Sequence, residues 1–273
     1  MKCRQIIDML EQLAPQYLAE SWDNCGLSYG NTEMNVDKIL VALEPTREVI
    51  NQAIDMKADM IITHHPMIFS PIKTLDCDKV IGRKITDLAK NDIVSYSMHT
   101  NMDVAVMASV AADKLGLKGV TRLEVTIANV LDEDLSVHKD AATAIGLGSV
   151  GDLDNGVSLE QCSELVKNSF GIDRLRVVGD LKHIIKRIAI LPGSGKSYIK
   201  KAIKEKADVL ITGDIDYHSA VDALEAGICV IDAGHFDTEH FFVEYIAKYL
   251  EENLEFSNIQ VNIATEKSPF TII

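Results

Sequence analysis

The sequence predicts an α/β protein made of two related lobes, with mixed sheets flanked by helices. The first observation is a repeat: residues 39–65 align with residues 188–214 at a constant offset of 149, and nine of the 27 positions are identical. The second is that short apolar, β-branched runs alternate with helix-like stretches, which is typical of βαβ units. Together they indicate an internal duplication with one such unit in each lobe.

The elements of the first repeat follow from local patterns. Apolar residues at helical spacing predict a helix over Cys3–Leu13, which stops before Pro15. The apolar run Lys38–Leu43 predicts a strand, and Thr46 can cap the helix after it. Met60–Ile62 predicts the next strand, so the order is strand, helix, strand.

Three further elements are expected before the middle of the chain. Val80–Lys90 has the pattern of a helix, and Ile93–Tyr96 has that of a strand. Asp103–Leu115 predicts another helix, closed by Gly116. The regular alternation favours a largely parallel arrangement of these strands.

The middle of the chain, residues 123–180, has a less regular pattern and contains a glycine-rich stretch at residues 146–151. Within it, Ser158–Phe170 predicts a helix that starts with a capping box. After the second repeat, Phe241–Leu250 predicts a helix and Ile259–Ile263 alternates like a half-buried strand. We expect lobes over residues 1–125 and 126–273, and the C-terminal strand, within about residues 258–273, can return to the first sheet.

The composition excludes several classes of protein. The 273 residues are 47% hydrophobic, which is enough for about two cores. The sequence contains no apolar run long enough for a membrane span and no signal-peptide pattern. Five scattered cysteines without a CxxC pair predict reduced thiols and a cytoplasmic location. The net charge of −14 makes nucleic acid an unlikely partner, because a broad basic face is missing.

Adjacent histidines follow the second predicted strand. His64 and His65 lie where a parallel strand ends, which is where sites form in such sheets. Neighbouring side chains on an extended segment point in different directions, so the two rings suit two adjacent metal ions. Two ordinary strand-end histidines are the alternative.

The runs that follow each repeat end in His-x-x-x-acid. In the second, His235 and Glu239 lie one helical turn apart and can bind one ion, and the Glu239 carboxylate can bridge two. In the first, Asp103 is the better ligand candidate, and His99 can contact substrate or hold another group. The alternatives are an acidic first helical turn and a structural histidine.

The second repeat places Asp214 where the first has His65. Asp214 can orient a ligand histidine or contact substrate, and His218 can act as general acid or base. We therefore predict both as catalytic, against a structural role of about equal weight.

A glycine-rich turn, Gly193, Ser194 and Gly195, resembles the end of a P-loop but lacks the glycine that the motif needs at residue 190. Its backbone N–H groups can cradle a phosphate or carboxylate. A simple tight turn between strand and helix is the alternative.

In combination, these motifs resemble one family. They are Trp22-Asp-Asn-x-Gly-Leu, Ile62-Thr-His-His-Pro66, His99-Thr-Asn-Met-Asp103, Gly193-Ser-Gly195, Ile211-Thr-Gly-Asp214 with Tyr217-His218, and Gly234-His235 with Glu239. The family is the YbgI-like dinuclear metal centre family, also called Nif-three-like and described as GTP cyclohydrolase I type 2 homologues.

The resemblance implies a metal site in the cleft between the lobes, with two divalent ions held by His64, His65, Asp103, His235 and a bridging Glu239. It implies a homohexamer, and this chain looks like the short form without an inserted extra domain. Zn, Fe, Mn, Co and Ni all suit the ligand set.

Two functions follow as hypotheses. One is a metal-dependent hydrolase in which metal-activated water attacks a nucleotide or related heterocycle, as a GTP cyclohydrolase does. The other is a non-catalytic metal-binding or regulatory assembly protein with the same ligands.

Overall fold

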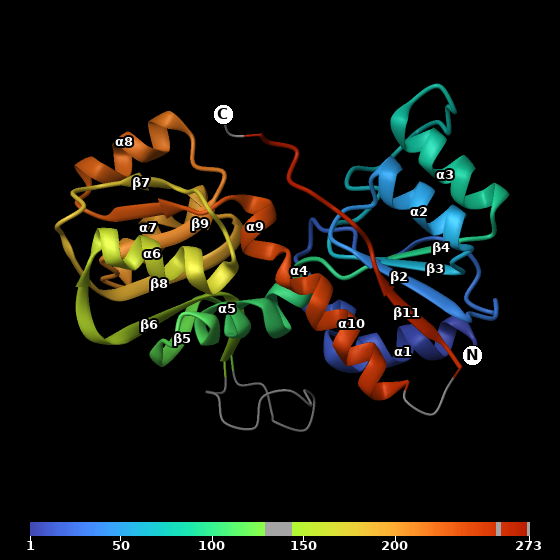
Figure 1. The fold of residues 1–273 in the computed structure, drawn as a ribbon, viewed down its shortest axis with the longest axis horizontal. Helices are drawn as coiled ribbons and strands as arrows, with labels where there is room; N and C mark the ends of the chain where they lie inside the picture. Colours follow the sequence, from blue (N-terminus) through green and yellow to red (C-terminus); the bar gives the residue numbers. More distant parts are fainter. Residues whose placement is uncertain (129–143, 255–257, 272–273) are drawn as a thin grey trace. The chain divides into compact units, whose positions relative to one another are not determined.

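The computed structural model describes residues 1–128, 144–254 and 258–271 (Figure 1). The chain divides into two compact units, each with one mixed sheet and its own helices. The first unit is Met1–Met102 with Phe242–Ile273, and the second is Asp103–Phe241. The predicted fold class, α/β with two mixed sheets flanked by helices, is confirmed.

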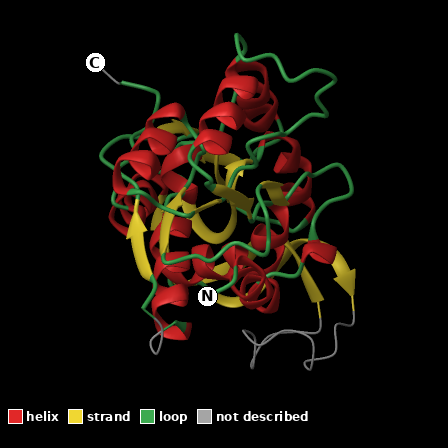
Figure 2. Cartoon of the chain, turned by 90° about the vertical axis from the view of Figure 1, so that its right-hand side faces the viewer, coloured by secondary structure: helices red, strands yellow, loops and turns green. Residues whose placement is uncertain are grey.

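The first unit has a five-stranded sheet in the order β1-β4-β3-β2-β11. Its strands β2, β3, β4 and β11 are parallel neighbours, and β1 is an antiparallel edge strand. Helices lie on both faces of this sheet (Figures 1 and 2). The elements are α1 (Cys3–Leu13), a 3-10 turn (Gln16–Leu18), β1 (Gly26–Tyr29), β2 (Lys38–Ala42), α2 (Arg47–Met56), β3 (Met60–Thr63), α3 (Val80–Lys90), β4 (Val94–Ser97), α4 (Thr100–Met102), α10 (Phe241–Asn253) and β11 (Gln260–Ile263).

The C-terminal segment belongs to the first sheet. In Figure 1, β11 (red) runs beside β2 (blue), and the two are parallel with Val261 opposite Ile39. Beyond the strand, the Glu266 carboxylate accepts hydrogen bonds from the backbone N–H groups of Leu43 and Glu44, at 2.6 and 3.0 Å. The end of β2 is therefore held by residues from the far end of the sequence.

The second unit has a six-stranded sheet in the order β5-β6-β8-β9-β10-β7. Strands β8, β9 and β10 are parallel, and the other pairs are antiparallel. The elements are a π-helical turn (Asp103–Met107), α5 (Ala108–Lys114), β5 (Lys118–Ala128), β6 (Ala144–Ser158), α6 (Leu159–Phe170), β7 (Arg176–Val178), β8 (Ile184–Ser194), a 3-10 turn (Lys196–Tyr198), α7 (Ile199–Lys204), β9 (Val209–Gly213), α8 (Tyr217–Glu225), β10 (Cys229–Asp232) and α9 (His235–Glu239).

The glycine-rich middle of the chain is more regular than the sequence pattern indicates, since it forms β6. Glycine usually weakens a strand, but here two strands approach closely. A Cβ at Gly146 would lie 1.8 Å from the backbone oxygen of Glu124 on β5, so only glycine fits. Gly148 has φ +60°, a conformation that glycine adopts at little cost.

The two repeats make the same contacts at the same offset. The Asp59 carboxylate accepts hydrogen bonds from the N–H groups of residues 37 and 38, and Asp208 accepts them from residues 186 and 187. Lys57 and Lys206 each come just after a helix, and both have a left-handed backbone conformation, with φ of 57° and 58°. An evolutionary duplication remains a prediction, but the repeated sequence forms equivalent local structure.

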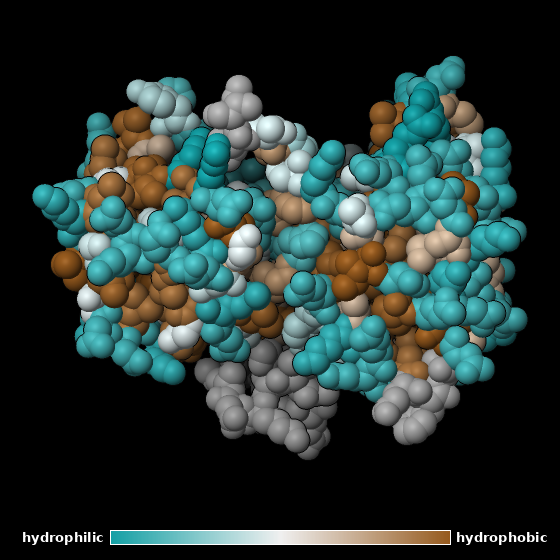
Figure 3. Space-filling model, in the orientation of Figure 1, coloured by the Kyte–Doolittle hydropathy of each residue, from teal (hydrophilic) through white to brown (hydrophobic). Residues whose placement is uncertain are grey.

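Hydrophilic residues predominate on the face shown in Figure 3, with smaller apolar patches between them. Among the described residues, no helix combines the length and the apolar character that crossing a membrane requires.

Candidate metal centre

Three histidines gather in the first unit, and we call them the histidine cluster: His64, His65 and His99. His64 and His65 directly follow β3, and His99 follows the end of β4. One ring nitrogen from each lies within 4.8 Å of the other two. Because β3 and β4 are parallel neighbours, their carboxyl ends meet at one edge of the sheet. The cluster can therefore hold a metal ion.

The local backbone explains why both adjacent histidines reach this edge. All four residues of β3 are buried, which fixes the strand in the sheet. The His65 N–H donates to the Leu43 carbonyl at 3.0 Å, and the Thr63 hydroxyl donates to the His65 carbonyl at 2.8 Å. These bonds hold the chain at the point where it leaves the sheet.

Each ring of the histidine cluster has an oxygen partner at Nδ1. His64 Nδ1 lies 2.8 Å from the Met98 carbonyl oxygen, and His65 Nδ1 lies 2.7 Å from Glu44 Oε1. His99 Nδ1 lies 2.8 Å from Asp23 Oδ1. Such partners orient an imidazole, raise its basicity and direct Nε2 toward a metal ion.

Asp23 is a buried carboxylate that fixes His99. Burial alone would raise its pKa, but hydrogen bonds from the His99 ring and from the Thr100 hydroxyl and N–H outweigh it and lower the pKa to about 2. Asp23 therefore stays ionised and can stabilise a proton on His99 Nδ1.

The second unit carries a histidine–carboxylate pair on α9, and we call it the α9 pair: His235 and Glu239. The two residues lie one helical turn apart, with His235 Nε2 3.0 Å from Glu239 Oε2. His235 Nδ1 lies 2.7 Å from Asp214 Oδ2, so Asp214 orients the ring. The Glu239 side chain is buried, with 5% exposed. A buried carboxylate of this kind is stable when a cation or a hydrogen-bond donor compensates its charge.

Gly193 packs directly against the α9 pair. A Cβ at this position would lie 2.1 Å from Glu239 Oε1 and 3.5 Å from His235 Nε2, and the backbone has φ +73°. The Gly193 N–H donates to the Thr238 hydroxyl at 3.0 Å. Only glycine lets the turn approach the carboxylate this closely.

The rest of the glycine-rich turn is also bonded within the unit. The Thr212 hydroxyl donates to the Gly193 carbonyl at 3.1 Å, and the Gly195 N–H donates to the Gly213 carbonyl at 3.4 Å. Ser194 is exposed and lies opposite Gly213 in the sheet. The role of Gly193, Ser194 and Gly195 as an anion cradle stays a prediction, and the described bonds give the turn a structural role.

Two predicted residues remain, and one of them lies close to the α9 pair. Asp103, which also belongs to the second unit, offers a carboxylate oxygen within 4.8 Å of one from Glu239. Asp103 begins a π-helical turn, although the pattern predicts an α-helix from that residue. Such wider turns often occur at functional sites. His218 is exposed in the first turn of α8, beside the ring of Tyr217.

Sequence reasoning missed two carboxylates that orient histidines. Glu44 directly precedes a proline, and Asp23 stands in a polar loop, so neither position shows a periodic pattern. The sequence did contain a signal for Glu44, because the offset of 149 aligns it with Gly193, which is a predicted site residue. In the structure, Gly193 also packs against a candidate ligand.

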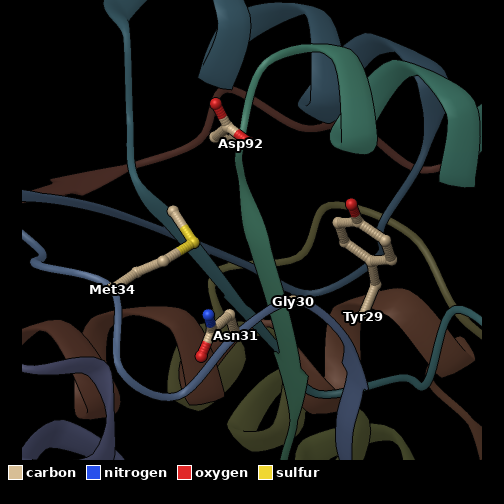
Figure 4. A pocket seen from close by; sticks show the side chains of 5 residues that line it. All are labelled: Tyr29, Gly30, Asn31, Met34 and Asp92. Carbon is tan, nitrogen blue, oxygen red and sulfur yellow. The ribbon is translucent and has the colours of Figure 1, made fainter.

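A surface pocket of 520 Å³ lies elsewhere in the first unit (Figure 4). It is lined by Tyr29, Gly30, Asn31, Met34 and Asp92. Asp92 precedes β4, whereas His99 follows it, so the pocket belongs to the opposite end of that strand. It contains none of the predicted site residues.

The fold and these groups define an α/β protein with histidine and carboxylate clusters that can bind metal ions. The chain belongs to the Duf34/NIF3 (NGG1p interacting factor 3) family, whose model matches residues 1–269. The resemblance seen in the motifs is thereby confirmed.

Relatives and solved structures agree with this family over the full chain. A "GTP cyclohydrolase 1 type 2 homolog" of Clostridium perfringens is 38% identical and covers 100% of both chains. A Bacillus cereus protein related to NIF3 has a TM-score of 0.90 at 27% identity, covering 100% of this chain and 99% of that one. Reduced HcgD from Methanocaldococcus jannaschii has a TM-score of 0.80 at 31% identity, covering 96% and 97%.

Proposed function

We propose that this protein is a dinuclear metal-dependent hydrolase that acts on a nucleotide or a related heterocycle, as the name of its relatives indicates for them. The observation that carries the proposal is the histidine cluster, in which every ring has an oxygen partner at Nδ1. Histidines that bind a metal almost always have such a partner at their other ring nitrogen, and sites in parallel sheets form at the carboxyl ends of the strands.

The donor set fits divalent transition metals. Imidazole nitrogens and carboxylate oxygens are borderline and hard ligands, which suit Zn, Fe, Mn, Co or Ni. The close packing of Gly193 against Glu239 supports a carboxylate held in one position. We assign the two ions to five ligands: His64, His65, Asp103, His235 and a bridging Glu239.

When bound, two divalent ions supply Lewis acidity and make water a nucleophile near neutral pH. The residues of the chain contribute orientation and proton transfer. Asp214 holds the His235 ring through Nδ1, and Glu44 does the same for His65. We assign proton transfer to His218, whose exposed ring can exchange protons with water.

The family resemblance also leads us to propose a homohexamer. Light scattering after size-exclusion chromatography should give six times the chain mass. A monomer at micromolar concentration would contradict this proposal without touching the metal assignment.

Metal content and turnover test the function. Native protein purified without chelator should contain two metal ions per chain by elemental analysis. His65→Ala and Glu239→Gln should each lower that content, whereas His183→Ala, an exposed histidine of the second unit, should not.

Turnover of GTP should then depend on the same residues. Metal-loaded wild-type protein should convert GTP, and Glu239→Gln should lose at least a hundredfold in rate. Full metal content without turnover of any nucleotide would overturn the hydrolase and favour a non-catalytic metal-binding or assembly role.

A further inference from the structure

Two large aromatic side chains stand exposed beside the histidine cluster. Trp22 is 57% exposed and Phe69 is 55% exposed. Their ring centroids lie 5.9 Å apart with the planes inclined by 54°. Both rings also lie against the His99 ring, with centroid-to-centroid distances of 6.1 Å for Trp22 and 6.3 Å for Phe69. An exposed aromatic pair that adjoins a polar cluster is unusual, because water contact with such rings costs free energy.

Hydrogen bonds hold the loop of Trp22 in place. On one side of Trp22, the Glu20 N–H donates to the Thr100 hydroxyl at 2.9 Å. On the other side, the Asp23 carboxylate accepts bonds from Thr100 and pairs with His99. The exposed indole is thus carried by an anchored segment.

A further bond links this loop to the one that carries Phe69. The Asn24 side-chain amide donates to the Ile68 carbonyl at 2.6 Å, directly before Phe69. The two rings are therefore positioned relative to each other and to His99. A fixed aromatic surface lowers the entropy cost of binding a flat ligand.

We propose that Trp22 and Phe69 form an aromatic face that binds the planar heteroaromatic ring of the substrate. This inference rests on the proposed function and names the part of the substrate that the first unit recognises. One ring can stack on the ligand while the other, inclined to it, contacts the ligand edge, as aromatic groups prefer. Stacking accepts any flat base, and the hydrogen-bonding groups of the histidine cluster lie alongside.

The occupant that we infer is a ring rather than an aliphatic chain or a phosphate. Neither Trp22 nor Phe69 offers an anion a positive charge, and the residue that follows Trp22 is an acid, Asp23, whose carboxylate pairs with His99. The described aromatic contacts include no lysine or arginine at these two rings. The chemistry of this face therefore selects the base of a nucleotide and not its phosphates.

Trp22 is the only tryptophan of the chain, so its fluorescence reports on this face directly. Native metal-loaded protein would be titrated with GTP, guanosine, ribose 5-phosphate and tripolyphosphate. We expect saturable quenching by GTP and guanosine and none by the two compounds without a ring. Equal quenching by tripolyphosphate, or none by any ring compound, would overturn the proposal.

Matched variants separate stacking from mere bulk. By calorimetry, Trp22→Leu and Phe69→Leu should bind guanosine roughly ten- to a hundredfold more weakly, since stacking contributes about 1–3 kcal/mol per base. Trp22→Phe and Phe69→Tyr should stay within a fewfold of wild type. Tyr17→Leu, which removes another exposed aromatic ring of the same unit, should leave binding unchanged.

Two further readouts keep the inference distinct from the proposed function. Metal content and unfolding midpoint should match wild type in Trp22→Leu, which excludes misfolding. Guanosine binding without turnover of any nucleotide would overturn the hydrolase and leave the proposal of an aromatic face intact. Normal guanosine binding by Trp22→Leu together with an altered oligomeric mass would show that the ring contacts another copy, and the inference would fail.

Discussion

The left-handed backbone of Gly193 places this residue against the α9 pair, and its replacement tests whether that contact affects metal binding. Gly193→Ala places a methyl group against Glu239 Oε1 and forces alanine into φ +73°. The left-handed backbone alone costs about 1–2 kcal/mol. We expect that loss in urea unfolding and, in addition, at least tenfold weaker metal binding.

A second glycine serves as the control for this substitution. Gly227 has a similar φ of +78°, but a Cβ there meets nothing within 4 Å. Gly227→Ala should show the loss of stability with normal metal binding. Equal metal affinity in the two variants would mean that contact with Glu239 does not matter.

The Asp23 carboxylate makes stability depend on pH. Its pKa is about 2 in the folded chain against 3.8 ordinarily, so the ionised form favours folding. The contribution, about 2 kcal/mol, is complete above pH 4–5 and is lost as the pH falls toward 2. The free energy of unfolding of Asp23→Asn should therefore fall less than that of wild type as the pH is lowered toward 2.

Acid unfolding should be followed in metal-free protein, so that loss of metal does not contribute. Asp78→Asn, which changes an exposed carboxyl of the same unit, provides the comparison. Parallel acid curves for Asp23→Asn and wild type would refute the stabilising role of the pair with His99.

At the level of elements, Thr238 joins α9 to the turn that ends β8. Its buried hydroxyl accepts from the Gly193 N–H at 3.0 Å and donates back to the Gly234 carbonyl at 2.7 Å. Thr238→Val leaves the N–H without this acceptor and should cost about 1–3 kcal/mol. Thr238→Ser keeps the hydroxyl and should restore most of the stability, measured by urea unfolding.

The repeated acidic position gives a prediction for each βαβ unit. Asp59 and Asp208 each accept two backbone N–H bonds from the strand beside them. Asp59→Ala and Asp208→Ala should each cost about 1–3 kcal/mol of unfolding free energy, because the N–H groups lose their acceptor. A large loss at one site and none at the other would show that the repeats are not energetically equivalent.

Most elements could be predicted from the sequence because their signals are local. The capping bonds of Thr46 and Ser158 and the apolar period of α1 all act within a few residues. The strand β6 could not be predicted, since its glycines are required by the close approach of the partner strand β5, which lies outside the local sequence window. His64 and His65 could be predicted because they follow a strand. The carboxylates that orient the rings could not, since Glu44 contacts His65 and Asp23 contacts His99 through tertiary contacts that leave no local pattern.

For the molecule as a whole, bound metal should add to stability. A ligand present at a hundred times its Kd stabilises the folded state by about 2.7 kcal/mol. Since domains of 150–250 residues shift by roughly 2–4 °C per kcal/mol, chelation should lower the unfolding midpoint by roughly 5–10 °C. His65→Ala should have a lower midpoint that chelation no longer changes. An identical chelation effect in both proteins would place the stabilising metal elsewhere.

The pairing of β11 with β2 bears on the order in which a newly made chain can fold. Residues 103–241 are translated before Gln260–Ile263, so all strands of the six-stranded sheet have been made while the other sheet still lacks its edge strand. Until then β2 offers its N–H and C=O groups to other chains, which is a route to aggregation. Nascent chains stalled before residue 260 should therefore depend more on chaperones than released ones, because Gln260–Ile263 closes the sheet that carries the histidine cluster.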